Sequence, residues 1–179
     1  MTVADANRYA PVLRRLHWLM ASLIALGYLA IEQRGLFARG STARNAMVQS
    51  HYWIGLTIFV LAWWRIVQRR RFGAPAITPA LPVWQAGIGT LMHVLLYAFF
   101  IAMPIMGLAT AWLDGKSVFL PFTDIALPAL LAPDEAWAKT MEDLHGQVGE
   151  IFYWIIGFHV VAAIYHHFIR RDDTLRRMG

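Results

Sequence analysis

Seven histidines are the residues of this sequence best suited to chemistry, because each falls within or at the end of a long apolar stretch. An ionisable side chain inside a membrane-spanning segment is costly and by default indicates a function. A lone histidine could instead reach the interface or hydrogen-bond to a neighbouring helix. Seven of them with helical spacing favour ligand chemistry: His17, His51, His93, His145, His159, His166 and His167.

The spacing of His145 and His159 is the most informative feature. The two residues are 14 positions apart, which in an α-helix is about 40° short of four full turns and about 21 Å along the axis. Both rings then face the same way at different depths. This interval suits two haems, one near each side of a membrane. A proton relay would need closer groups, and a dinuclear metal site would need pairs three or four residues apart.

His51 is the natural partner of His145, because both lie near the start of an apolar stretch on the same side of the membrane. Each is followed four residues later by a glycine, Gly55 and Gly149. Residues four apart share a helix face, and glycine removes the side chain where a flat porphyrin would approach the backbone. The alternative is that these glycines serve helix packing. Together with the histidine pair, they favour a haem site.

The partner of His159 stays open between His17 and His93. When depth is counted in residues from the non-cytoplasmic edge of each span, His17 matches the depth of His159. When depth is counted from the cytoplasmic edge, His93 matches it better. Arg65 lies 14 residues after His51 and so on nearly the same helix face. It could bind a haem propionate through its two-pronged guanidinium group, or anchor its helix by reaching the cytoplasmic interface.

The composition of the chain is that of a membrane protein, so the histidines must be placed relative to a membrane. The chain has 179 residues, no cysteine, 58% hydrophobic residues and only 15% charged ones, with a mean hydropathy of +0.46. These values argue against a disordered chain, a disulfide-stapled domain and an ordinary cytosolic enzyme. Without cysteine there is no thiolate metal site, no iron–sulfur cluster and no covalently attached haem.

Four stretches are long and apolar enough to cross a membrane: about 16–32, 47–67, 86–112 and 144–169. Prolines interrupt the chain between the second and third stretches and again before the fourth. The sequence therefore predicts an all-α membrane protein with a single domain over 1–179. It would be a four-transmembrane-helix bundle with two haems between the helices.

The distribution of basic residues predicts the orientation. Eleven of the 16 Lys and Arg residues lie at the N-terminus, between the second and third spans, or at the C-terminus. Cytoplasmic segments carry the excess of positive charge, so both termini are expected on the cytoplasmic side of the membrane. The net charge of +5 then indicates contact with anionic lipid and not with nucleic acid.

Several short motifs resemble those of the prokaryotic cytochrome b561 family, whose members are four-helix, dihaem proteins of the inner membrane. The similarity runs over nearly the whole chain. It is carried by LHW at Leu16–Trp18, RG at Arg34–Gly35, HxxxG at His51–Gly55, LMHVLLY at Leu91–Tyr97, MPIMGL at Met103–Leu108, IGFHVVAAIYHHF at Ile156–Phe168 and DDTLRRM at Asp172–Met178.

The resemblance implies a ligand set and a reaction. It implies two non-covalent haem b groups, one held by His17 and His159 and the other by His51 and His145. It leaves His93 and His166 as candidates for a quinone site, where histidine suits proton donation; His166 could equally be an interfacial polar residue. Within the family, one activity is oxidation of superoxide outside the membrane with reduction of ubiquinone, and the resemblance implies that activity here.

Two further interpretations stay open. A positive entrance would speed capture of the superoxide anion, although ordinary solvated charge would look the same; the candidates, all expected in outer loops, are Arg34, Arg39, Arg44, Lys116 and Lys139. Alternatively, the chain is the cytochrome b anchor of a hydrogenase or dehydrogenase. It would then relay electrons from a partner subunit, docked on the long segment Leu113–Asp143, to the quinone pool.

Overall fold

The structure, a computed structural model, describes residues 7–179. It contains four long helices: α2 (Pro11–Gln33), α3 (Thr42–Phe72), α4 (Val83–Leu113) and α5 (Glu135–Tyr165). Each is long and apolar enough to cross a membrane. Short helical turns follow α2 at Arg34–Leu36, continue α5 as a π-helix at His166–Arg170, and end the chain at Arg176–Met178. The predicted all-helical bundle is confirmed. The first three expected spans lie within α2, α3 and α4, and the fourth runs from α5 into the π-helix that continues it.

Local sequence explains where the helices begin and end. Pro11 occupies the first turn of α2, where its missing N–H is not needed. Ser41 caps α3 by accepting a hydrogen bond from the Arg44 amide, and α3 ends at Gly73, whose φ of 70° suits only glycine without strain. Asp134 caps α5 by accepting a hydrogen bond from the Trp137 amide at 3.0 Å.

The start of α5 corrects one expectation. Hydropathy placed a long segment at Leu113–Asp143, but residues Glu135–Asp143 are helical and only residues 114–134 form the connection. Hydropathy missed these turns because they are polar. The cap at Asp134 and the acidic Glu135 in the first turn favour a helix start there, since both complement the helix dipole.

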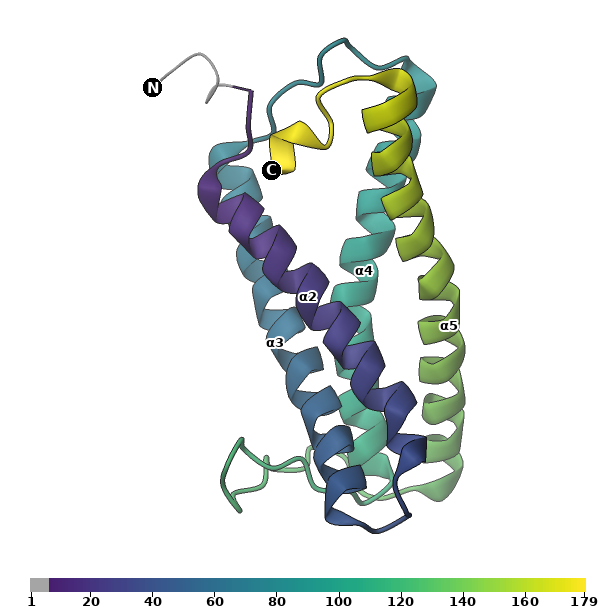
Figure 1. The fold of residues 1–179 in the computed structure, drawn as a ribbon. Helices are drawn as coiled ribbons and strands as arrows, with labels where there is room; N and C mark the ends of the chain where they lie inside the picture. Colours follow the sequence, from purple (N-terminus) through teal and green to yellow (C-terminus); the bar gives the residue numbers. More distant parts are fainter. Residues whose placement is uncertain (1–6) are drawn as a thin grey trace.

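The helices form a bundle with two distinct ends (Figure 1). α2 packs on α3, α3 on α4, and α4 on α5. The start of α2, the α3–α4 connection and the C-terminus gather at one end, here called the terminal end. The α2–α3 turn and the 114–134 connection lie at the other, here called the distal end.

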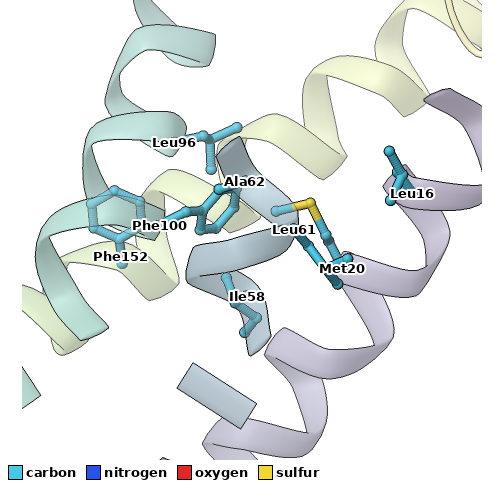
Figure 2. Packing of buried hydrophobic residues seen from close by; sticks show 8 residues of the cluster. All are labelled: Leu16, Met20, Ile58, Leu61, Ala62, Leu96, Phe100 and Phe152. Atoms are coloured by element: carbon cyan, nitrogen blue, oxygen red, sulfur yellow. The ribbon is translucent and has the colours of Figure 1, made fainter. Parts of the chain in front are cut away.

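A buried apolar cluster fills the middle of the bundle and draws on all four helices (Figure 2). Phe99 and Phe152 stack at its edge, with ring centroids 3.4 Å apart. Many other large apolar side chains face outward, as expected in lipid. The cluster lies between the two histidine groups described next, and its members are Leu16, Met20, Ile58, Leu61, Ala62, Leu96, Phe100 and Phe152.

Candidate functional site

The distal end brings together His51 of α3 and His145 of α5. Their ring centroids are 6.1 Å apart and their planes are nearly perpendicular, at 84°. A metal bound to one nitrogen of each ring, at about 2 Å per bond and with about 1 Å more to each ring centre, would set the centroids roughly 6 Å apart. The pair is therefore spaced to hold one metal ion between two imidazoles.

Hydrogen bonding at the distal pair suits ligation. The Nδ1 of His51 lies 3.0 Å from the Gly27 carbonyl oxygen. Donation to that carbonyl places the proton on Nδ1 and leaves the Nε2 lone pair free, as in most metal-ligating histidines. The buried Nδ1 of His145 has no hydrogen-bond partner among the described residues.

A cavity of about 840 Å³ surrounds this pair and is lined by both rings. Its volume lies in the range of about 300–1,000 Å³ that cofactor sites occupy. The predicted glycines Gly55 and Gly149 line it too. A Cβ on Gly55 would meet nothing closer than 4.0 Å, and one on Gly149 nothing closer than 3.7 Å. Both glycines thus keep open space beside the histidines.

Gly107 of α4 is a residue of this site that sequence reasoning missed. It lines the same cavity, and a Cβ there would lie 3.1 Å from Cε1 of His145. Gly107 stands inside the MPIMGL motif, which was the one available signal. Its role depends on the contact between α4 and α5, which no spacing within α4 reveals.

The predicted cationic residues divide into two groups. Arg34, Arg44 and Lys116 line the distal cavity, whereas Arg39 and Lys139 do not. The expectation that all five lie in loops was wrong. Arg44 is in the first turn of α3, and Lys139 is on α5, where it forms an ion pair with Asp143 at 2.7 Å. Acidic residues also line the cavity: Glu32, Glu142 and Glu150.

Two tyrosines bridge α2 and α5 at this cavity, and sequence reasoning did not identify them. Tyr28 donates to the Gly149 carbonyl at 2.9 Å, and Tyr153 donates to Glu32 at 3.1 Å. Their ring centroids are 4.3 Å apart. Side chains rather than close backbone packing thus connect these two helices beside the cavity.

The terminal end brings three histidine rings together. His159 of α5 lies 6.2 Å from His17 of α2 and 6.0 Å from His93 of α4, measured between ring centroids. Either distance fits two imidazoles on one metal ion. Nη1 of Arg65 lies 3.2 Å from Nδ1 of His17, so the guanidinium group is beside this cluster instead of extending to the interface.

His166 belongs to a different cluster. Its Nδ1 lies 2.6 Å from the buried Asp172 carboxylate, which also pairs with Arg170 at 3.1 Å. Burial acts to raise the pKa of Asp172, but hydrogen bonds with His166 and Thr174 outweigh it and hold the pKa below its ordinary value of 3.8. His166 thus takes part in a polar contact with the C-terminal segment.

These residues fit haem better than a bare metal ion. Among residues 7–179, no three His, Cys, Asp or Glu side chains gather so as to hold a metal. Histidine pairs lack the ligands that complete a zinc site, whereas in haem the porphyrin supplies the remaining donors and the protein supplies the axial ligands. The cavity beside His51 and His145 has room for such a flat group.

Comparison with known proteins decides the family. The family model for prokaryotic cytochrome b561 matches residues 8–179. The chain belongs to the prokaryotic cytochrome b561 family. It is thus a multi-pass membrane protein of electron transfer that uses b-type haem, as the resemblance in the sequence predicted.

Relatives in this family align over almost their full length. Cytochrome b561 homolog 1 of Escherichia coli (strain K12) is 35% identical over 173 residues, covering 96% of this chain and 97% of that protein. The probable superoxide oxidase CybB of Yersinia pestis is 30% identical, covering 96% of each chain. Cytochrome b561 homolog 2 of Escherichia coli (strain K12) is 29% identical, covering 96% of this chain and 91% of that protein.

Proposed function

We propose that this cytochrome b561 protein is a superoxide:ubiquinone oxidoreductase that carries two haem b groups. In the proposed reaction, two superoxide anions are oxidised to two molecules of oxygen. Their two electrons, with two protons, reduce one ubiquinone to ubiquinol. The protein would lie in the bacterial inner membrane with both termini in the cytoplasm, since most of its Arg residues are at the terminal end.

The observation that carries this proposal is that histidines gather at both ends of the bundle, and that α5 contributes one histidine to each group. The ring centroids of His51 and His145 are 6.1 Å apart at the distal end, and those of His17 and His159 are 6.2 Å apart at the terminal end. An apolar layer separates them. The printed name of the Yersinia pestis relative, a probable superoxide oxidase, supports superoxide as the donor.

The chain's own residues would divide the work between the two ends. His51 and His145 would hold the distal haem, and His17 and His159 the terminal one. Bound haem b supplies one-electron redox chemistry. Arg34, Arg44 and Lys116 would draw a small anion into the distal cavity. His93 and His166 would supply protons for ubiquinone at the terminal end.

A reduced-minus-oxidised spectrum of the purified protein, with haem counted per chain, tests the proposal. We expect two b-type haems that superoxide reduces and a short-chain ubiquinone reoxidises. Added superoxide dismutase should abolish the reduction, which controls for other reductants. Two haems that do not respond to superoxide would instead indicate a relay subunit for a dehydrogenase. A protein that binds no haem would contradict the haem assignment itself.

A further inference from the structure

The connection between α4 and α5 contains a small apolar hairpin, Val118–Leu127, which neither the histidine sites nor the proposed reaction explains. Phe119 and Ala126 form an antiparallel bridge. The Leu120 amide donates to the Ile125 carbonyl at 2.7 Å, and the Leu127 amide donates to the Val118 carbonyl at 2.8 Å. These bonds give the loop a defined shape that presents particular side chains.

The hairpin exposes large apolar side chains that it does not bury in the protein. Phe122 at the tip is completely exposed, and Ile125 is 62% exposed. The adjoining Leu130 is 75% exposed. Between residues 117 and 133 the one charged residue is Asp124. A water-facing loop would carry far more polar surface, and clustered exposed apolar residues mark a binding surface.

The attachment of the hairpin sets its depth relative to the membrane. Gln49 of α3 donates to the Ser117 carbonyl at 2.9 Å and accepts from the Phe119 amide at 3.1 Å. The Trp53 indole donates to the Phe119 carbonyl. Gln49 and Trp53 lie in the first two turns of the apolar stretch 47–67. The hairpin is therefore attached where the membrane begins, not beyond it.

The direction of the hairpin agrees with this depth. In Figure 1 it extends sideways past α3 at the distal end, and does not cap the end of the bundle. The spans themselves expose large apolar side chains, among them Val60 of α3 and Ile105 of α4. Indole groups such as Trp53 favour the same interfacial level. The ion pair of Lys116 with Asp114 lies at the base of the hairpin, where polar groups can stay in water.

We propose that the Val118–Leu127 hairpin inserts Phe122 and Ile125 into the lipid leaflet at the distal end and serves as a membrane anchor beside the distal cavity. Phe119 and Ser117 line that cavity, so the anchor holds one of its walls in position. Insertion is driven by apolar burial alone, because the hairpin has no cation to attract anionic lipid. The inference does not depend on the identity of the substrate.

The absence of cysteine makes a direct depth measurement possible. A spin label is attached to F122C, and separately to I125C, in haem-loaded protein reconstituted in phosphatidylcholine vesicles. Accessibility to oxygen, which concentrates in lipid, is compared with accessibility to a water-soluble nickel complex. The control is R39C, which is exposed in the α2–α3 turn at the same end.

We expect oxygen accessibility to exceed nickel accessibility at both hairpin positions, and the reverse at R39C. Nickel accessibility at F122C and I125C as high as at R39C would overturn the proposal. Protection from both reagents, with spin–spin broadening, would also overturn it and indicate a second copy of the chain. Protection from both without broadening would also overturn it and indicate that the labelled side chain is buried against the rest of the chain. Haem content measured on each labelled sample verifies that the variant has folded.

Discussion

His159 stands between two histidine rings, and this arrangement poses the sharpest question at the scale of single residues. Its ring centroid is 6.2 Å from His17 and 6.0 Å from His93. A haem iron takes one axial ligand on each face, so only one of the two can share iron with His159. The other would remain beside the site, free to serve a different purpose such as proton donation.

Separate alanine variants distinguish the two histidines. If the family resemblance holds, H17A should retain one haem per chain and H93A should retain two, because only the first change removes a ligand. The measurement is haem per chain together with the low-spin signals in electron paramagnetic resonance. H167A, outside the three-ring cluster, is the control and should keep both haems. Two low-spin haems in H17A, with one lost in H93A, would transfer the assignment to His93.

Gly107 allows a second test at the residue scale. A Cβ at this position would lie 3.1 Å from the His145 ring, so G107V should displace that ring and weaken haem binding at the distal end. G87V, on the same helix but with nothing within 4 Å of the new Cβ, is the matched control for the effect of valine on helix propensity. We expect haem per chain to fall in G107V and to stay unchanged in G87V. Equal haem content in both would contradict the contact.

At the scale of elements, the C-terminal segment Asp172–Met178 crosses the terminal end and holds other elements together there; it is here called the strap. Arg177 is buried and donates to the Pro75 carbonyl at 2.7 Å and to the Tyr9 hydroxyl at 3.1 Å. The Trp18 indole donates to the Met178 carbonyl at 2.9 Å. The DDTLRRM motif thus connects α5 to the start of α2 and to the α3–α4 connection (Figure 1). These contacts explain its composition without any catalytic role.

Asp172 gives this strap a pH dependence. Hydrogen bonds with His166 and Thr174 hold its pKa below 3.8 despite burial. A carboxyl group whose pKa is lowered by folding stabilises the protein above the unfolded pKa, and this contribution is lost as the pH falls through the folded pKa. Replacement by Asn would leave buried partners unpaired, at a cost of about 1–3 kcal/mol.

The expected result is that D172N unfolds at a lower temperature than the wild type near pH 7. The difference should begin to shrink as the pH falls below the unfolded value of about 3.9, and it should be lost as the pH falls through the lower pKa of the folded state. Thermal unfolding of detergent-solubilised protein, followed by circular dichroism, measures it. D173N is a comparison on the same segment, since Asp173 is only half-buried and accepts from the Thr78 amide at 2.9 Å. A stability difference between D172N and wild type that does not vary with pH would contradict this account.

At the scale of the whole molecule, charge is distributed unevenly between the two ends. The terminal end has the larger share of arginines, which is why we propose that this end faces the cytoplasm. At the distal end, the positive residues that line the cavity are Arg34, Arg44 and Lys116, and the acidic Glu32, Glu142 and Glu150 line it too. Attraction of an anion depends on where charge lies relative to an opening rather than on net charge, so this placement matters more than the total of +5.

Removal of the cavity cations should therefore slow superoxide-driven haem reduction. The triple variant R34Q/R44Q/K116Q should lower the rate about tenfold at low salt and flatten its salt dependence. The double variant R39Q/K139Q should have a smaller effect, because neither Arg39 nor Lys139 lines the cavity. The measurement is the rate of superoxide-driven haem reduction in each variant at several ionic strengths, with samples matched for haem content. Equal effects of the two variants would exclude steering by the cavity.

The sequence alone determined the four helices, the similar depth of His51 and His145 near the starts of their spans, and the shared face of His145 and His159. It could do so because each of these features depends on residues close together within one span. In lipid an apolar run of about 20 residues must form a helix to satisfy its backbone, and the period of that helix places residues 14 apart on one face. The polar first turns of α5 were missed for the same reason, since hydropathy does not report capping.

Only the tertiary structure decided which residues meet across helices. It placed the Gly27 carbonyl behind His51, Gly107 against His145, and Asp172 on His166. It also placed Lys116 at the cavity, whereas Lys139 does not line the cavity and pairs with Asp143 on α5. Such contacts depend on the rotation and tilt with which helices pack. Those are set by the combined fit of all four helices and leave no periodic signal in any one of them.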